Sequence, residues 1–372
     1  MTYKITSERI YAETVDSGVV SRHMGTATNP DTNAASVRVA EHITSRDNRW
    51  LKQFRAALAG EPARASRASK ATRPPDGTEA PASNALWVLP HEPSGSNEEI
   101  VGVEGARLVR TVLQIALRSG LEIIAVLTSD SGARHLAVLA AIIPPTARIL
   151  TTTDALFARV SGTETPQGIA AFVRPYAATF DDLVRGTPLI VAMLGVQDPG
   201  NVGALVRTAD VFGATGIAAC AAGGTGTANP FAPKALRASA GSALRLPILR
   251  GVAAPVLLTQ LRIAGVTVYA TCPGDFRGER ANGVAAGASS RKVLAPWDVD
   301  WRAPAALLMG NEGAGLPAEI VRSADALVRI PQAAWDAPCS ADSAVDAAVD
   351  SLNVAVAGGV LLYEAARQRG LA

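Results

Sequence analysis

The chain has 372 residues, enough for two domains of ordinary size. Hydrophobic residues make up 48% and charged residues 18%, proportions typical of a globular protein and not of a disordered one. The net charge of +2 does not by itself indicate a nucleic-acid ligand. No apolar run reaches the roughly 18–20 residues that cross a bilayer, and the N-terminus lacks the apolar segment of a signal peptide. We therefore expect a cytoplasmic protein without a membrane segment.

The cysteines and histidines argue against a metal or disulfide framework. Cys220, Cys272 and Cys339 are widely separated and odd in number, which disfavours both a set of disulfides and a cysteine-based zinc site. The four histidines show none of the spacings that metal ligands adopt on a helix. We expect no metal.

The first hundred residues predict a tail, a basic helix and an insertion. Residues 1–40 show no sustained periodicity and predict a flexible tail. Residues 43–59 predict a helix that Thr44 or Ser45 caps. Residues 61–97 are mostly Ala, Ser, Pro and Arg and predict a flexible insertion, whose basic half is either a solvated linker or an RNA contact. The helix carries the apolar stripe Trp50, Leu51, Phe54 and Leu58.

Two series of alternating strands and helices follow. Residues 100–172 read as strand, helix with a glycine stop at Gly120, strand, helix, strand and strand, which indicates a small α/β domain. A polar connection around residues 174–187 marks the domain boundary. Beyond it, four short apolar runs with helical patterns between the first three predict a second α/β domain.

The stretch LGVQDPGNVGALVRTADVFGATG, at residues 194–216, predicts a buried strand, a tight turn and a helix. Exposed N–H groups at such a helix start favour an anion or a polar ligand. The spacing is not G-x-G-x-x-G, however, and no P-loop lysine follows. Arg207 falls almost opposite the apolar face of this helix, so taken alone it is either a ligand contact or a solvated arginine.

Three further stretches combine tight turns with polar residues. LLMGNEGAGLP, at 307–317, is a strand followed by a glycine-rich turn that holds Glu312. Residues 350–370 predict a core helix opened by Asp350 or Ser351. Residues 229–248 predict a surface loop and helix, where Lys234 and Arg237 are placed to meet phosphate. By themselves these stretches indicate an α/β ligand-binding protein.

Taken together and in this order, the segments resemble the SpoU-type RNA ribose 2′-O-methyltransferases of the SPOUT superfamily. The family's motifs are D-P-x-N-x-G-x-x-x-R-T-A-x-x-F-G, R-A-S-x-G-S, G-N-E-G-x-G-L, I-P and S-L-N-V. They match residues 198–213, 237–242, 310–316, 330–331 and 351–354. Upstream, residues 43–58, 102–113 and 160–173 resemble a small RNA substrate-binding domain that is itself similar to ribosomal protein L30e.

The resemblance implies an α/β fold with two domains. Residues 188–372 would form a parallel-sheet SPOUT methyltransferase domain with a deep trefoil knot, and residues 41–174 the L30e-like domain in front of it. Knots are otherwise nearly absent from proteins, so no pattern of residues predicts one. The resemblance also implies a homodimer with its sites at the interface.

The resemblance further implies S-adenosylmethionine as the methyl donor, bent into the knot loops. The matching cofactor-binding positions are Gly310, Asn311, Gly313, Ile330, Pro331 and Leu352.

Five residues match the family's catalytic positions. Arg207 would hold a phosphate and the ribose 2′-oxygen, because a guanidinium with a pKa above about 12 is a poor general base. Asn201 and Asn353 would position the ribose or the arginine. Glu312 would hold the second loop, and Ser351 would cap the last helix beside the cofactor. RNA contacts are expected at Arg46, Arg49, Lys52, Lys234 and Arg237.

One departure from the family pattern lies beside the expected cofactor site. Residues 332–350 form a loop about a dozen residues longer than is usual, with Trp335 and Cys339 in it. The leading hypothesis is a methyltransferase acting on ribosomal RNA of the 23S type. The alternatives are a tRNA 2′-O-methyltransferase and an RNA-binding homologue that the insertion has silenced. A nicotinamide oxidoreductase would need a G-x-G-x-x-G turn and an acidic ribose-binding residue, and the sequence has no such pair.

Overall fold

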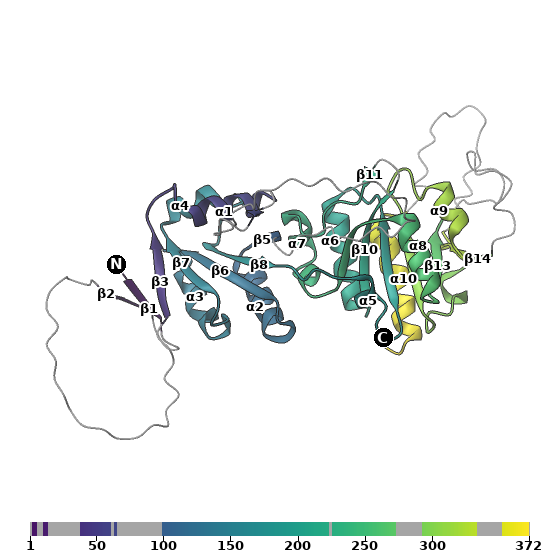
Figure 1. Ribbon diagram of the computed structural model, residues 1–372, viewed down its shortest axis with the longest axis horizontal. Coiled ribbons are helices and arrows are strands. Elements are labelled where there is room, and N and C mark those ends of the chain that lie inside the picture. Colours follow the sequence, from purple (N-terminus) through teal and green to yellow (C-terminus); the bar gives the residue numbers. More distant parts are fainter. Residues whose placement is uncertain are drawn as a thin grey trace, which may run out of the picture.

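Two eight-stranded sheets, one after the other along the chain, organise this computed structural model (Figure 1). The structure describes residues 2–5, 10–13, 38–60, 63–64, 99–222, 225–272, 292–332 and 352–371. Helices flank each sheet, and the two sheets lie side by side along the longest axis of the molecule.

The first sheet has the strand order β2-β1-β3-β7-β6-β8-β5-β4. Its centre, β3, β7 and β6, is parallel, and β8 and β5 are antiparallel to their neighbours. The strands are β1 (Thr2–Ile5), β2 (Ile10–Glu13), β3 (Arg38–Ile43), β4 (Ala63–Arg64), β5 (Glu99–Glu104), β6 (Glu122–Ser129), β7 (Arg148–Thr152) and β8 (Ile169–Arg174). The helices are α1 (Arg49–Ala59), α2 (Ala106–Ser119), α3 (Ala133–Leu139) and α4 (Asp154–Val160).

The second sheet has the order β11-β10-β9-β15-β13-β16-β14, with β12 also paired to β10. Every one of these pairings is parallel except that of β11 with β10, so the predicted parallel α/β fold is confirmed. The strands are β9 (Leu189–Leu194), β10 (Gly216–Ala222), β11 (Thr225–Gly226), β12 (Ile248–Ala253), β13 (Thr267–Thr271), β14 (Val293–Leu294), β15 (Ala305–Met309) and β16 (Ala326–Val328). The helices are α5 (Phe180–Leu183), α6 (Pro199–Val211), α7 (Pro233–Ala238), α8 (Ala254–Ile263), α9 (Ala318–Ser323) and α10 (Val354–Gln368).

The central strands of the second sheet are apolar throughout because both of their faces are covered. All six residues of β9 and all five of β15 are buried. One face packs against α6 and α10, through residues such as Leu205 and Leu362, and the other against α8 and α9, through Leu261 and Ile320. The sheet therefore leaves its strand ends, and not its faces, free to bind a ligand.

The N-terminal segment differs from the prediction of a tail without regular elements. Within residues 1–40, β1 and β2 pair as an antiparallel hairpin, and β1 pairs in turn with β3. A sheet edge supplies hydrogen-bond partners to a short segment whose own sequence shows no sustained period. Within the predicted insertion the structure describes β4, and residues 61–62 and 65–97 lie outside the described residues.

The cap of α1 differs from the one expected from the sequence. Asn48, and not Thr44 or Ser45, caps this helix, because its side chain accepts from Trp50 N over 2.8 Å. The hydroxyl of Ser45 accepts from Asp47 N instead. Several residues of the capping type stand in a row here, and the one next to the first helical residue has the geometry to cap.

The two halves of the molecule share one apolar cluster and make specific contacts. The cluster runs without interruption from Val101 and Leu113 in the first half to Leu189 and Leu236 in the second. Beside it, Arg250 on β12 forms a half-buried ion pair with Glu99 on β5. These contacts fix the position of one sheet relative to the other. They therefore determine which residues of the two halves lie next to each other.

Candidate functional site

The carboxyl ends of β9 and β15 place two turns next to each other. These strands are adjacent and parallel, with Met193 paired to Met309 at their last registered position. The turns that follow, at 195–198 and 310–317, therefore meet at one edge of the sheet. That edge is where open parallel sheets bind their ligands.

The turn after β15 is a tight loop that its own backbone and Asn311 hold together. Asn311 and Gly315 exchange two backbone hydrogen bonds of 3.1 and 3.0 Å. The Asn311 side chain donates to Gly195 O over 2.9 Å and accepts from the N–H groups of Gly313 and Ala314. A Cβ at Gly310 would lie 2.5 Å from the carbonyl carbon of Gly315. The glycine at 310 is thus required by a close backbone approach, and Asn311 ties this loop to the turn after β9.

Three polar side chains from three distant segments form one chain of hydrogen bonds. Asn201, in the first turn of α6, donates through Nδ2 to Glu312 Oε1 over 2.8 Å. Its Oδ1 accepts from Asn353 Nδ2 over 3.1 Å. The structure therefore brings together three of the five predicted catalytic residues, which come from the three separate motifs.

Asn353 also begins the last helix. Its Oδ1 accepts from Ala355 N and Val356 N, so it is the N-cap of α10. The predicted capping role of Ser351 is wrong, since the cap lies two residues later. Ser351 itself lies outside the described residues, as do Trp335 and Cys339 of the long loop.

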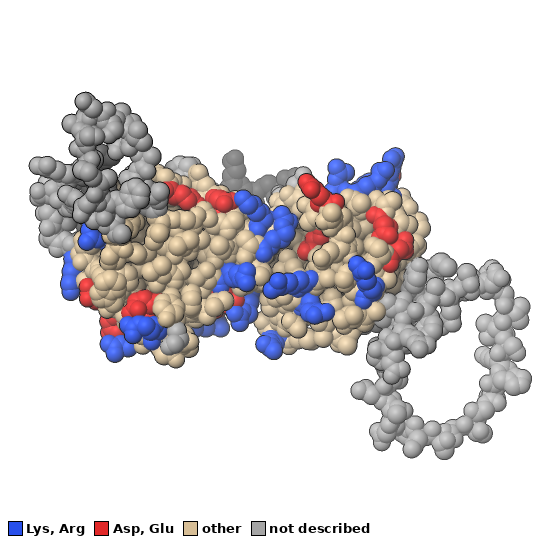
Figure 2. All heavy atoms as spheres, turned by 180° about the vertical axis from the view of Figure 1, so that it is seen from behind, with Lys and Arg blue, Asp and Glu red and all other residues tan. Residues whose placement is uncertain are grey.

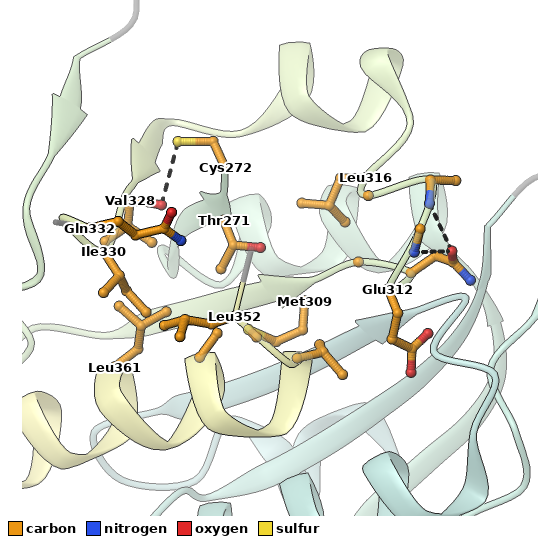
Figure 3. A pocket seen from close by; sticks show the side chains of 17 residues that line it. Thr271, Cys272, Met309, Glu312, Leu316, Val328, Ile330, Gln332, Leu352 and Leu361 are labelled. Carbon is orange, nitrogen blue, oxygen red and sulfur yellow. Dashed lines mark hydrogen bonds between the residues drawn. The ribbon is translucent and has the colours of Figure 1, made fainter. Parts of the chain in front are cut away.

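A cavity of about 340 Å³ opens beside this hydrogen-bonded chain (Figure 3). Such a volume falls within the roughly 300–1,000 Å³ of small-molecule sites. Its walls come from the ends of β13, β15 and β16 and from the start of α10. In Figure 3, Ile330, Leu352 and Leu361 form an apolar side, and Glu312 lies at the other end from Gln332. Of the predicted cofactor positions Gly310, Asn311, Gly313, Ile330 and Leu352 line the cavity, and the exposed Pro331 does not.

Several cavity residues were not predicted from the sequence. Thr271 and Cys272 close one side, because β13 lies between β15 and β16 in the sheet and ends at the same edge. Burial raises the pKa of the Cys272 thiol to about 11, so it stays protonated at neutral pH. Its Sγ donates to Val328 O over 3.6 Å. Apolar residues at the end of a predicted strand were the available signal, but the strand order that makes them neighbours is not visible in the sequence.

Arg207 lies apart from this chain of side chains. It lies six positions after Asn201 on α6, about 9 Å along the helix and about 120° around it. Arg207 is exposed and lines a second hollow, together with Arg107 and Arg237. Within this chain, therefore, the structure does not bring Arg207 to the cavity beside Glu312.

Lys234, one of the predicted RNA contacts, is bound to the turn after β9. Its Nζ lies 2.6 Å from Asp198 Oδ1, the carboxylate that caps α6 through Gly200 N. The hydrogen bond from Lys234, followed by that from Gly200, lowers the pKa of Asp198. Lys234 thus positions the start of α6, with part of its charge already compensated.

Three of the predicted RNA contacts lie on or before α1, in the first half, whereas Arg237 lies on α7. Arg46, Arg49 and Lys52 are exposed or half-exposed, and Lys52 lies 3.2 Å from Asp47. The Arg49 guanidinium stands over the Trp50 ring at 5.5 Å from its centroid. The structure leaves this group separate from the cavity beside Glu312.

Two absences hold for the described part of the chain. It contains no group of three or more His, Cys, Asp or Glu side chains placed to hold a metal ion. Nor does any helix in the described ranges combine the length and the apolar character that spanning a membrane requires.

The comparisons with known proteins point to one family. Residues 188–363 match the SpoU rRNA Methylase family. An uncharacterized tRNA/rRNA methyltransferase from Synechocystis sp. is 33% identical over 218 residues, which are 58% of this chain and 65% of that protein, slightly less than two thirds of it. The 23S rRNA (guanosine(2553)-2′-O)-methyltransferase RlmP of Bacillus subtilis (strain 168) is 31% identical over 208 residues, 56% of this chain and 68% of that protein.

A solved structure extends the similarity over both halves. An AdoMet-bound rRNA methyltransferase from Sinorhizobium meliloti superposes with a TM-score of 0.59 at 27% identity. The match covers 88% of this chain and 98% of that one.

Proposed function

Because the chain belongs to the SpoU rRNA Methylase family, we propose that it transfers a methyl group from S-adenosylmethionine to a ribose 2′-hydroxyl of RNA. The observation that carries this proposal is the chain of hydrogen bonds from Asn353 through Asn201 to Glu312, beside the cavity of about 340 Å³. Three motif residues with no proximity in the sequence meet where a cofactor and a ribose would meet.

The cavity fits the proposed cofactor in its chemistry. Met309, Leu316 and Ile330 offer apolar surface for a purine ring, and the glycine-rich loop offers backbone groups at close range. Leu352 and Val354 also line the cavity. When bound, S-adenosylmethionine supplies an electrophilic methyl group on a sulfonium sulfur. The buried Cys272 thiol, with its raised pKa, is too weak an acid to compete as a thiolate nucleophile at neutral pH.

The proposed role of Arg207 is to bind the substrate. An exposed guanidinium is a strong hydrogen-bond donor to phosphate and to a developing alkoxide, and oriented charge of this kind is often the largest catalytic contribution. Asn201 and Asn353 would position the ribose, and Glu312 would hold Asn201 in place through its 2.8 Å hydrogen bond.

We propose a homodimer because Arg207 and the cavity do not meet within one protomer. An exposed apolar stripe on α10 supports a second copy: Val356, Val360 and Tyr363 are 53%, 40% and 51% exposed. Their spacing of four and three residues places them on one face of the helix. Since α10 packs beside α6, a partner seated on this stripe would lie close to Arg207.

Ribosomal RNA is the proposed substrate, and the cytoplasm the proposed location. The family's description, the Bacillus relative and the Sinorhizobium structure all carry rRNA in their names. Two further proposals follow from the resemblance of the motifs. These are an L30e-like RNA-binding domain at residues 41–174 and a trefoil knot within residues 188–372.

The test is methyl transfer from labelled S-adenosylmethionine to in vitro transcribed 23S rRNA and, in parallel, to tRNA. We expect incorporation into rRNA as an alkali-resistant nucleotide, because a 2′-O-methyl group blocks hydrolysis of the neighbouring phosphodiester. Arg207→Ala should lower incorporation by at least about 100-fold, within the range for loss of one oriented charge. Arg134→Ala, an exposed arginine that lines neither cavity, is the matched control.

Incorporation into tRNA alone would show that tRNA, and not rRNA, is the substrate of the proposed reaction. If the protein binds RNA yet neither binds S-adenosylmethionine nor transfers a methyl group, the silenced homologue is the correct function. The loop at 332–350 would then be the segment to delete.

A further inference from the structure

Two hollows lie between the two halves along α2. One hollow, of about 420 Å³, adjoins the start of α2 at Gly105, and a second, of about 720 Å³, adjoins its end at Ser119. Thr111 and Ala240 line both hollows, so the two hollows are neighbours, and together they are called the groove along α2. At about 1.5 Å per residue, the fourteen residues of α2 give it a length of about 21 Å. The two hollows together follow most of this length.

Three arginines from both halves line the first hollow. Arg107 comes from α2, Arg207 from α6 and Arg237 from α7. All three are exposed, and none forms an ion pair with any residue that the structure describes. In the second hollow, by contrast, Arg245 forms an ion pair with Asp210 at 2.5 Å. The first hollow therefore holds three arginines against one carboxylate, that of Glu104, and its net charge is positive.

The single carboxylate lining this hollow among the described residues is already engaged. Glu104 is 8% exposed. It accepts hydrogen bonds from the hydroxyls of Ser161 and Thr163 and from Gly162 N, at 2.5, 2.9 and 2.9 Å. Its role is to hold the loop that follows α4, and that loop contributes Thr163 and Gln167 to the hollow.

The start of α2 adds backbone donors to the same hollow. Gln167 Oε1 accepts from Ala106 N over 2.8 Å, and Val109 N bonds back to Gly105 O. No described residue accepts from the two N–H groups between them, those of Arg107 and Leu108. A helix start of this kind attracts anions. Together with the three arginines it makes a built anion site.

The position of Arg107 itself argues for a ligand. It is the second residue of α2, where the positive end of the helix dipole makes a cation unfavourable by about 0.3–1 kcal/mol. The first turn of α2 holds no acidic residue to offset this. A residue that lowers the stability of the free protein is explained if it binds an anion.

The turn at 239–241 fixes the groove's shape by packing one half on the other. Ala240 is the non-glycine residue with a positive φ, of 51°, among those described. Next to it, a Cβ on Gly241 would lie 3.0 Å from Thr111 Cγ2 of α2. The turn is therefore in close contact with α2, and Arg207 and Arg237 line the same hollow as Arg107.

We propose that this arginine-lined hollow binds a phosphodiester of the RNA substrate, and that the groove along α2 carries the strand past the methyl-transfer residues. The proposal rests on the proposed function and assigns Arg107, in the first half, to the same strand as Arg207 in the second. Figure 2 shows Lys and Arg side chains gathered along the seam between the two halves on the face that it presents.

The experiment measures filter binding of the full-length protein to in vitro transcribed 23S rRNA, and to tRNA, from about 50 to 200 mM salt. Each lost phosphate contact lowers the slope of log K against log salt by about 0.7–0.9. We expect that decrease in Arg107→Ala and in Arg237→Ala, and recovery of most of it in Arg107→Lys. Arg134→Ala should keep the wild-type slope. Arg107→Ala should also melt at or above the wild-type temperature, because it removes a cation from a helix start.

Wild-type slopes in both alanine variants overturn the proposal. So does an altered slope in Arg107→Ala that comes with a lowered melting temperature, since that indicates structural damage. The outcome is separable from the proposed function. Altered slopes without any methyl transfer would support RNA binding at the arginine-lined hollow and reject the proposed reaction. Methyl transfer with unaltered slopes would support the reaction and reject RNA binding at this hollow.

Discussion

Asn353 donates a hydrogen bond of 3.1 Å to Asn201, a residue 152 positions earlier in the chain. The same Asn353 side chain caps α10 through its oxygen, so one amide both starts a helix and orients a partner on another helix. Asn201 in turn donates a hydrogen bond to Glu312. The geometry of the site thus depends on how α6 and α10 begin.

Asn353→Asp separates the two roles of this side chain. Aspartate keeps the capping oxygen and loses the Nδ2 donor. We expect a melting temperature close to wild type and a decrease of about tenfold in methyl transfer, which corresponds to about 1.4 kcal/mol or one hydrogen bond. Asn353→Ala should also lose about 0.5–2 kcal/mol of stability with the cap. Equal activity of the Asp variant and wild type would show that the link to Asn201 is not needed.

Gly310→Ala should weaken cofactor binding. The new Cβ would lie 2.5–2.7 Å from backbone atoms of Gly315 and Leu316, and backbone cannot move aside as a flexible side chain does. The loop that lines the cavity must then open. We expect the affinity for S-adenosylmethionine, measured by titration calorimetry, to fall by more than about 10-fold. Gly226→Ala, which meets nothing within 4 Å, is the control and should bind normally.

Two neighbouring glycines of α10 should respond in opposite ways. A Cβ on Gly358 would lie 2.3 Å from Leu205 Cδ2 of α6, whereas one on Gly359 would meet Thr208 Cγ2 at 3.8 Å, an ordinary contact. Gly358→Ala should therefore destabilise by about 1–3 kcal/mol through overpacking. Gly359→Ala should stabilise by up to about 1 kcal/mol through helix propensity. Urea unfolding measures both, and equal effects would contradict the close contact of α10 with α6.

Charge on the exposed stripe of α10 should disrupt the proposed dimer. Val356→Glu and Val360→Glu place a carboxylate where apolar surface would be buried against a second copy. Light scattering should report a shift from dimer to monomer, with loss of methyl transfer. Ile263→Glu is the control: Ile263 is 82% exposed at the end of α8, on the opposite face of the sheet. A monomeric wild type, or a dimer that both stripe variants retain, would refute this interface.

The ion pair at the end of α10 should make the stability of the fold depend on pH in the acid range. Hydrogen bonds from Arg367, then from Gln368, lower the pKa of Glu364 from 4.5 to about 2. A lowered pKa in the folded state stabilises the fold above the unfolded pKa, and that stabilisation is lost as the pH falls from about 4.5 to about 2. Glu364→Gln should melt at most about 2–4 °C lower at pH 7, since such pairs contribute up to about 1 kcal/mol.

The difference in melting temperature between Glu364→Gln and wild type should vanish near pH 2. A difference that stays constant from pH 7 to pH 2 would show that the carboxylate charge is not involved.

The sequence by itself determined the nature of the elements. The apolar runs that form β9 and β15 are long enough and apolar enough to be buried strands and little else. The three glycines and the asparagine of 310–315 predict a tight turn wherever that turn is placed. Because such preferences are local, the α/β fold and the three motifs follow from the order of the residues alone.

Only the tertiary structure decided which residues meet. The strand order puts β13 between β15 and β16. Cys272, which belongs to none of the motifs, therefore lines the cavity. The N-cap of α10 is Asn353 and not the predicted Ser351, because capping depends on the backbone angles of a single residue. The tertiary structure also separated Arg207 from Glu312 and placed it in one hollow with Arg107, through packing between the two halves. Contacts across the chain depend on how surfaces fit, and a linear pattern carries no record of that fit.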